Sequence, residues 1–249
     1  GGFGLDGLLR SVQGRLIGLL NGIDVETWNP ASDPHLTANY DARNLAGKAL
    51  CRNRLAGHFN VKLGPRTALM AMVSRLVDMK GFDILAEAMP EMMKRDIAFV
   101  LLGSGQQECE ALARKWAEQW PGRVGVRIGY NAPLAHEIQA GADVMMLPSK
   151  SEPCGLTQFC SQRYGTLPLV HAVGGLADSV VDPTERPEAT GIKFTQYSGT
   201  ALLDAVDRSL ALVNDPAKRV SIQKRMMALD VSWRSAAELY LQHYERILH

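Results

Sequence analysis

The sequence predicts an α/β fold in which helices cover both faces of a parallel sheet, a doubly wound arrangement of the Rossmann type. Three observations predict it. Short apolar runs recur at intervals of roughly 20 to 30 residues, and segments with helical periodicity fill the intervals, as βαβ crossovers require. The runs are apolar throughout rather than alternating, which is typical of strands buried on both faces. The predicted strands cover residues 68–73, 97–102, 124–128, 144–147 and 167–170.

The intervals between these strands carry helix signals. Apolar residues recur at helical spacing over residues 82–93 and 112–120. Asn131 followed by Pro133 predicts a capped helix start, and this helix should run to Ala140.

The two ends of the chain differ from this central pattern. Residues 1–66 contain a loop signal at 29–34 and a polar helix over about 41–55. The C-terminal third carries three amphipathic segments, the second opened by Asp215-Pro216, which predict helices over 200–213, 216–229 and 232–248. We therefore expect a connector over residues 1–66, and one Rossmann-like domain with extra C-terminal helices over residues 67–249.

The opening residues suggest that the chain is incomplete. They read Gly-Gly-Phe-Gly-Leu, with no initiator Met, and an apolar stretch follows at residues 16–20. We expect the chain to be a piece of a longer polypeptide.

Composition excludes several classes of protein. The 27 Lys and Arg residues nearly balance the 26 Asp and Glu residues, so no overall basic field favours nucleic acid or an anionic membrane. The four cysteines match neither a disulfide scaffold nor a zinc spacing, and the histidines have no partner at ligand spacing, so we expect no metal site. No apolar run approaches the roughly 20 residues that cross a bilayer, and no signal segment opens the chain. We expect a protein that works without nucleic acid or a membrane.

Glycines follow the second predicted strand, where a parallel sheet places its ligand crevice. Gly103 and Gly105 begin a dinucleotide fingerprint, but Glu108 stands where the third glycine belongs. The motif is therefore weak evidence for a nicotinamide cofactor, and a tight strand-to-helix turn explains it about as well.

Two further glycine motifs each precede a predicted helix. Cys154-Gly155 and Gly174-Gly175 could offer free backbone amides and the positive end of a helix dipole to phosphate oxygens. Two such sites facing one crevice suit a diphosphate. No histidine neighbours Cys154 in sequence, so we expect its thiol to serve packing or loop geometry rather than catalysis.

Charged and aromatic residues also follow the strands. Arg75 and Lys80 lie on one loop and could hold a single anion together, although solvated surface charge is the plainer alternative. Glu152 is the only carboxylate of its loop segment and could accept paired sugar hydroxyls, or act as a helix cap. Tyr130 could stack on a nucleobase or simply line a rim.

Taken together, these motifs resemble those of bacterial glycogen synthases and plant starch synthases, which are retaining glucosyltransferases of the GT-B fold. The string Glu-Pro-Cys-Gly-Leu-Thr-Gln at residues 152–158 is highly specific to that group, and the resemblance runs over nearly the whole chain. Supporting strings are Asn21-Gly22-Ile23-Asp24, Ser74-Arg75-Leu76 with Lys80-Gly81, Gly103-Ser104-Gly105, Gly129-Tyr130, and Gly174-Gly175-Leu176.

The resemblance implies a role for each candidate residue. Arg75 and Lys80 would hold the diphosphate of ADP-glucose, and Tyr130 would lie against the adenine. Glu152 would bind hydroxyls of the transferred glucose. The loop that touches sugar and phosphate would comprise Cys154, Gly155, Leu156 and Thr157. The family needs no metal or separate cofactor, and ADP is favoured over UDP.

The resemblance also implies a function and a partner. The reaction would transfer glucose to the non-reducing end of an α-1,4-glucan with retention, in bacterial cytoplasm or plastid stroma. The family's N-terminal domain, with its catalytic histidine and acceptor groove, is absent here, so the chain alone should be inactive. The family shows other residues at Met79, Lys150-Ser151 and Val173.

Three other functions remain to be weighed. A stand-alone nucleotide- or glucan-binding module would need only this half of a cleft. A nicotinamide oxidoreductase is disfavoured by the broken glycine fingerprint. Another GT-B transferase, such as a sucrose synthase, is disfavoured by residues 152–158.

Overall fold

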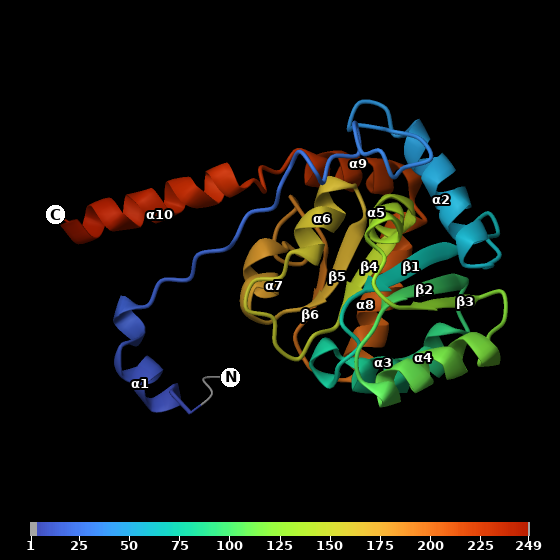
Figure 1. Cartoon of the computed structure of the whole chain (residues 1–249), viewed down its shortest axis with the longest axis horizontal. Coiled ribbons are helices and arrows are strands. Elements are labelled where there is room, and N and C mark those ends of the chain that lie inside the picture. Colours follow the sequence, from blue (N-terminus) through green and yellow to red (C-terminus); the bar gives the residue numbers. More distant parts are fainter. Residues whose placement is uncertain (1–3, 249) are drawn as a thin grey trace.

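The computed structural model describes residues 4–248, and its central feature is a six-stranded sheet in which all the strands run parallel (Figure 1). The first three residues of the predicted connector, and His249, lie outside the described residues. The strands are β1 (Ala68–Val73), β2 (Ile97–Gly103), β3 (Val124–Ile128), β4 (Val144–Leu147), β5 (Leu167–His171) and β6 (Ile192–Phe194). The predicted fold class is confirmed, and the five predicted strands agree with β1–β5 to within one residue at each end.

The strand order places a crevice at the middle of the sheet. The order is β3-β2-β1-β4-β5-β6, so β1 pairs with both β2 and β4. The chain runs outward through β2 and β3 and then returns to the centre at β4. In such sheets the crevice opens beyond the carboxyl ends of the two central strands, here β1 and β4.

Helices cover both faces of the sheet (Figure 1). Those on one face include α3 (Phe82–Met92), α4 (Gln107–Gln119) and α8 (Gly199–Val213), and those on the other include α2 (Ala46–His58) and α5 (Ala132–Gly141). The remaining helices are α1 (Asp6–Ser11), α6 (Thr157–Arg163), α7 (Gly174–Ser179), α9 (Pro216–Met227) and α10 (Trp233–Leu248), with short 3-10 turns η1 (Gln13–Arg15) and η2 (Asp78–Lys80).

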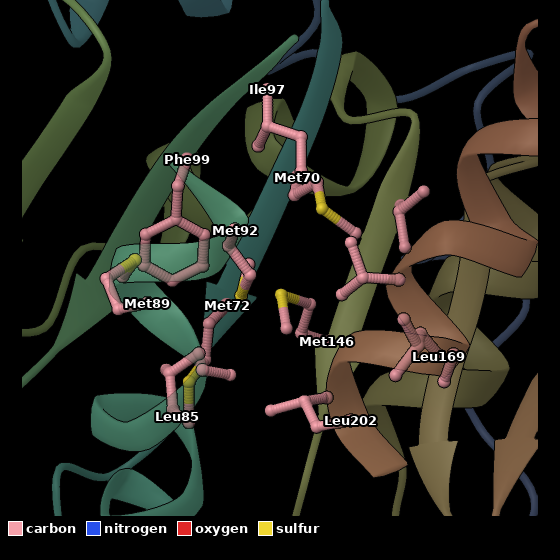
Figure 2. Packing of buried hydrophobic residues seen from close by; sticks show 14 of the residues in the cluster. Met70, Met72, Leu85, Met89, Met92, Ile97, Phe99, Met146, Leu169 and Leu202 are labelled. Atoms are coloured by element: carbon pink, nitrogen blue, oxygen red, sulfur yellow. The ribbon is translucent and has the colours of Figure 1, made fainter. Parts of the chain in front are cut away.

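Burial on both faces explains the continuous apolar runs of the sequence. Along β1, Met70 and Met72 join the cluster beneath α3 and α8, whereas Leu69 and Ala71 join the cluster beneath α2 and α5. Successive side chains of a strand point to opposite faces, so a strand covered twice must be apolar at every position. Figure 2 shows the first of these clusters, in which methionines of β1, β4 and α3 pack among Phe99, Leu169 and Leu202.

The helix signals are largely confirmed. Asn131 caps α5 by accepting a hydrogen bond from the Leu134 amide at 2.9 Å. Asp215 caps α9 by accepting from the amides of Ala217 and Lys218. The predicted helix over 41–55 begins later, as α2, because the Asp41 side chain accepts from two backbone amides of the following residues and forms a turn there.

The predicted connector contributes to the core of the sheet. Leu55 and Phe59, at the end of α2, are buried in the cluster that covers β1 and β2. Residues 46–61 therefore pack as part of the same core, whereas the domain boundary at residue 66 stays a prediction. The start of the described chain, with α1, extends away from the sheet, as does α10 (Figure 1). The two ends are joined on the domain, where the Ile23 amide donates to the Val231 carbonyl at 2.8 Å just before α10 begins.

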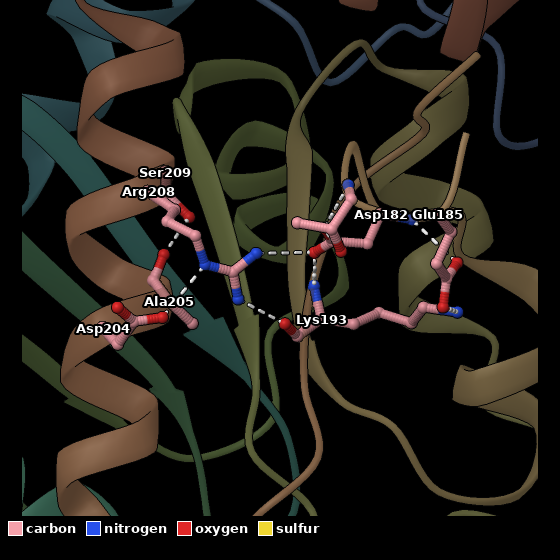
Figure 3. Close-up of polar contacts among 8 residues, drawn as sticks. Asp182, Glu185, Lys193, Asp204, Ala205, Arg208 and Ser209 are labelled. Carbon is pink, nitrogen blue, oxygen red and sulfur yellow. Dashed lines mark hydrogen bonds and ion pairs between the residues drawn. The ribbon is translucent and has the colours of Figure 1, made fainter. Parts of the chain in front are cut away.

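The sixth strand, β6, was not predicted, because it is three residues long and has a charged centre at Lys193. A polar cluster holds it in place (Figure 3). The Asp182 carboxylate accepts hydrogen bonds from the Lys193 amide at 2.6 Å and from the Arg208 guanidinium, on α8, at 2.8 Å. Arg208 also donates to the Lys193 carbonyl. This cluster fastens the edge of the sheet to α8.

Candidate functional site

The loops that follow β1 and β4 are locked together at the carboxyl edge of the sheet. The Lys150 amide donates to the Met79 carbonyl at 2.9 Å. Gly81 adopts a φ of 82°, and a Cβ there would lie 2.0 Å from the Pro148 carbonyl oxygen. Only glycine permits this approach, which brings Lys80 against the loop after β4.

Lys80 and Glu152 form the centre of the candidate site. The Lys80 ammonium contacts Glu152 Oε2, and the Ser149 hydroxyl donates to the same oxygen at 3.1 Å. The two charged side chains are 20% and 14% exposed. Among the described contacts, two ammonium protons of Lys80 and the second carboxylate oxygen of Glu152 have no partner. Both groups can therefore take up a ligand.

This pair lines the smaller of two adjoining pockets, which share Val73 and Ser74 at the end of β1. The smaller, of about 40 Å³, is lined by Lys80, Ser149, Glu152, Gly155, Leu156 and Thr157. The larger, of about 240 Å³, is lined by Arg75, Gly103, Ser104, Gly129, Tyr130 and Asn131. The structure thus brings most of the predicted residues to one continuous crevice beside the switch in strand order.

Arg75 and Tyr130 are open to solvent in the larger pocket. The Arg75 guanidinium forms no hydrogen bond or ion pair with residues 4–248, and Tyr130 is 93% exposed. An unpartnered guanidinium is available to an anion, and an uncovered ring face is available for stacking. The roles predicted for these side chains stay predictions.

Gly103 and Gly105 allow the loops that follow β1 and β2 to approach each other closely. A Cβ at Gly103 would lie 2.0 Å from the Ser74 carbonyl oxygen, and one at Gly105 would lie 2.3 Å from that of Leu76. The Leu76 amide donates to the Ser104 carbonyl at 2.9 Å, which extends the pairing of β1 with β2. Gly103 lines the larger pocket, and Gly105 lines neither.

Gly174 and Gly175 pack against the loop that carries Glu152 and line neither pocket. A Cβ at Gly174 would lie 2.2 Å from the Glu152 carbonyl oxygen. The Gly175 amide donates to the carbonyls of Glu152 and Pro153, so in this conformation it is not free for a phosphate oxygen. These glycines hold the Glu152 loop, and their predicted contact with a donor stays a prediction.

Cys154 points away from the crevice. Its thiol accepts a hydrogen bond from the Asn21 amide at 3.3 Å and packs beside the N-terminal segment. This position agrees with a role in loop packing rather than catalysis.

Sequence reasoning missed the support beneath Glu152. Ser149 is buried, and its carbonyl accepts a hydrogen bond from His171 Nδ1 at 2.8 Å. Ser149 therefore connects the Glu152 carboxylate to the end of β5. Its place directly after Pro148 at a strand end was the available signal.

Lys150 turns away from the pockets to Asp83, at 2.8 Å. The hydrogen bond that Lys150 donates to the Asp83 carboxylate raises the pKa of Lys150 above its usual value. Lys150 therefore contributes positive charge outside the crevice.

Residues 4–248 contain neither a cluster of metal ligands nor a membrane-spanning helix. No three His, Cys, Asp or Glu side chains lie close enough together to hold a metal ion. None of the helices in this part of the chain is both long and apolar enough to cross a membrane.

The sequence matches a known family and curated relatives. A profile of the family described as Glycosyl transferases group 1 matches residues 57–226. The chain is 44% identical to a glycogen synthase of Rhodopseudomonas palustris over 99% of its own length and 51% of the relative's. It is 45% identical to a glycogen synthase of Anaeromyxobacter, with 99% and 52% covered. The chain therefore spans about half the length of the curated relatives it matches.

Solved structures share the fold. The catalytic domain of starch synthase IV from Arabidopsis thaliana, bound to ADP and acarbose, superposes with a TM-score of 0.91 at 32% identity, covering 99% of this chain and 52% of that one. A sucrose-phosphate synthase from Thermosynechococcus elongatus superposes with a TM-score of 0.65 at 20% identity, covering 96% and 56%. The second likeness concerns the fold alone.

Proposed function

Because this chain belongs to the glycosyl transferases group 1, we propose that it is the donor-binding half of a glycogen synthase that uses ADP-glucose. The reaction is the transfer of glucose to the non-reducing end of an α-1,4-glucan, with retention of configuration. The observation that carries the proposal is the Lys80–Glu152 pair, which lines the smaller of two adjoining pockets at the carboxyl edge of the sheet.

The donor occupies both pockets in this proposal. The adenine lies against Tyr130 in the larger pocket, and the diphosphate lies near Arg75 and Lys80. The two free ammonium protons of Lys80 donate to phosphate oxygens, and the free Glu152 oxygen accepts from glucose hydroxyls in the smaller pocket.

The chemistry is electrostatic. As the bond between glucose and diphosphate breaks, negative charge grows on the departing phosphate and the sugar becomes oxocarbenium-like. Lys80 and Arg75 stabilise the first charge, and Glu152 fixes the sugar through its hydroxyls. The acceptor then attacks from the side of the leaving group, which retains configuration.

Two sets of relatives support the choice of donor and acceptor. The glycogen synthases are at least 43% identical to this chain over 99% of its length, and the starch synthase carries ADP and acarbose. The positions at which the sequence departs from the family pattern, Met79, Lys150, Ser151 and Val173, line neither pocket. We therefore expect those substitutions to leave the reaction class unchanged.

The acceptor groove belongs, in this proposal, to a second domain of the complete enzyme. Such a domain would close over the carboxyl edge of the sheet and exclude water from the crevice. This chain then supplies donor recognition, and the second domain supplies the acceptor.

Glucose transfer by the complete enzyme tests the proposal. In a polypeptide that contains this chain, Glu152→Ala should lower incorporation of glucose from ADP-glucose into glycogen at least about tenfold, about 1.4 kcal/mol of transition-state stabilisation. Exposed Glu108→Ala serves as the matched control and should retain the parent rate. Near-parental transfer by the Glu152 variant would refute the assignment.

A further inference from the structure

A second charged hollow lies at the opposite, amino edge of the sheet. It comprises two adjoining pockets of about 250 and 160 Å³, which share Ala49, Arg52, Asp143 and Arg219. The pockets open beside the starts of β1 and β4, and α2 and α9 line them. They share no residue with the crevice around Lys80 and Glu152.

Positive charge dominates this hollow. Four cationic side chains from three separate segments line it: Lys48 and Arg52 of α2, Arg66 of the loop before β1, and Arg219 of α9. Asp143 is the one carboxylate among the lining residues, and it is already engaged. Its Oδ2 accepts from Arg52 at 2.9 Å and from the Leu69 amide at 2.8 Å.

Two of the guanidinium groups have no partner. Within residues 4–248, neither Arg66 nor Arg219 forms a side-chain hydrogen bond or an ion pair. Arg219 is only partly exposed, so water does not surround it fully. Both side chains can therefore donate to an anion in the hollow without giving up an existing contact.

Lys48 is engaged within the protein. Its ammonium is buried and donates to the carbonyls of Ala140 and Tyr164 and to the Thr166 hydroxyl. Burial lowers the pKa of Lys48 to about 7; Asp143 acts against this lowering, and the repulsion from Arg52 and Arg219 is smaller than either. The carboxyl end of α8 contributes about half a negative charge at the rim of the hollow. The positive charge of the three guanidinium groups is larger than this.

We propose that this hollow binds the phosphate group of a small anion through Arg52, Arg66 and Arg219. Guanidinium groups present paired donors that match the oxygens of phosphate, and charges from separate elements can surround such a group on several sides. The site is separate from the donor crevice and does not depend on the function proposed above.

Calorimetric titration of this chain with inorganic phosphate tests the proposal. The Arg66→Ala/Arg219→Ala double variant should raise the Kd for phosphate at least about tenfold. The matched control, Arg54→Ala, removes an exposed arginine of α2 that lines neither pocket and should leave the Kd unchanged. Lys80→Ala should also leave this binding event unchanged, which separates it from phosphate in the donor crevice.

Any of three results would overturn the proposal. The parent chain could fail to bind phosphate saturably, the double variant could keep the parent Kd, or Arg54→Ala could lose as much phosphate affinity as the double variant. Should the double variant fold poorly, Arg66→Gln alone decides the matter, because Arg66 is exposed on a loop and its replacement disturbs no packing. A parallel titration with glycerol phosphate shows whether inorganic phosphate or a phosphate monoester binds more tightly. The tighter ligand indicates the class of the natural occupant.

Discussion

Two charged clusters of this chain differ in how completely their hydrogen bonds are used. In the Asp182 cluster every charge is engaged (Figure 3). Asp182 pairs with Arg208, both bond to the backbone of Lys193, and the Lys193 ammonium pairs with Glu185. In the pair of Lys80 and Glu152, by contrast, two ammonium protons and one carboxylate oxygen have no partner among the described contacts. The comparison teaches that the first cluster stabilises the fold, whereas the second keeps its bonding capacity for a ligand.

The largest expected effect is on stability, at Asp182. Its side chain is 3% exposed, and Asp182→Ala leaves Arg208 and two backbone amides without their acceptor. We expect the free energy of unfolding, measured by urea titration, to fall by about 3 kcal/mol. Asp204→Ala removes the other, 71% exposed partner of Arg208 and should change it by less than about 1 kcal/mol. Equal effects of the two variants would contradict the distinction.

The next effect is on binding, at Lys80. Lys80→Ala should raise the Kd for ADP at least about tenfold, about 1.4 kcal/mol, because the diphosphate loses one of its two cationic partners. Lys150→Ala, which removes a lysine directed to Asp83, is the control and should bind ADP nearly as the parent does. Calorimetry measures both, and equal weakening in the two variants would argue against the site.

A smaller effect is expected at Tyr130. Loss of stacking in Tyr130→Ala should weaken ADP binding by about 1 kcal/mol, roughly fivefold. Pyrophosphate has no base and should bind this variant as it binds the parent chain. If Tyr130→Ala weakened pyrophosphate equally, the ring would not be the base contact.

The pH dependence of stability should show the smallest effect. Burial raises the pKa of Asp182, but hydrogen bonds from Lys193, Thr184 and Arg208 outweigh it and hold the pKa below its usual value. A carboxylate of this kind stabilises the fold above its unfolded pKa of about 3.9, and that contribution is lost as pH falls through the folded pKa. The decline in unfolding free energy below about pH 4 should be shallower in Asp182→Asn. An unchanged slope would show that other carboxylates control it.

The strands and caps could be predicted because they depend on local patterns. Residues 68–73 are apolar at every position, and Asn131 and Asp215 precede proline-containing first turns. Strand β6 escaped detection because its placement depends on Asp182 and Arg208, which lie 11 and 15 residues away from Lys193 in sequence. Sequence patterns do not show such distant contacts.

The candidate site was only partly predictable, for the same reason. Position after a strand end was enough to select Arg75, Lys80, Glu152 and Tyr130, which the structure places around one crevice. Gly174 and Gly175 could not be distinguished from ligand-binding glycines, because the carbonyls they approach lie about 20 residues earlier in the chain.

Calorimetric titration of this chain with ADP and NAD in parallel decides whether the crevice recognises the ADP part of a nucleotide-sugar donor. We expect saturable binding of ADP that is weakened in Lys80→Ala, and an affinity for NAD at least about tenfold lower. Equal or tighter binding of NAD, or an ADP affinity indifferent to the loss of Lys80, would contradict it.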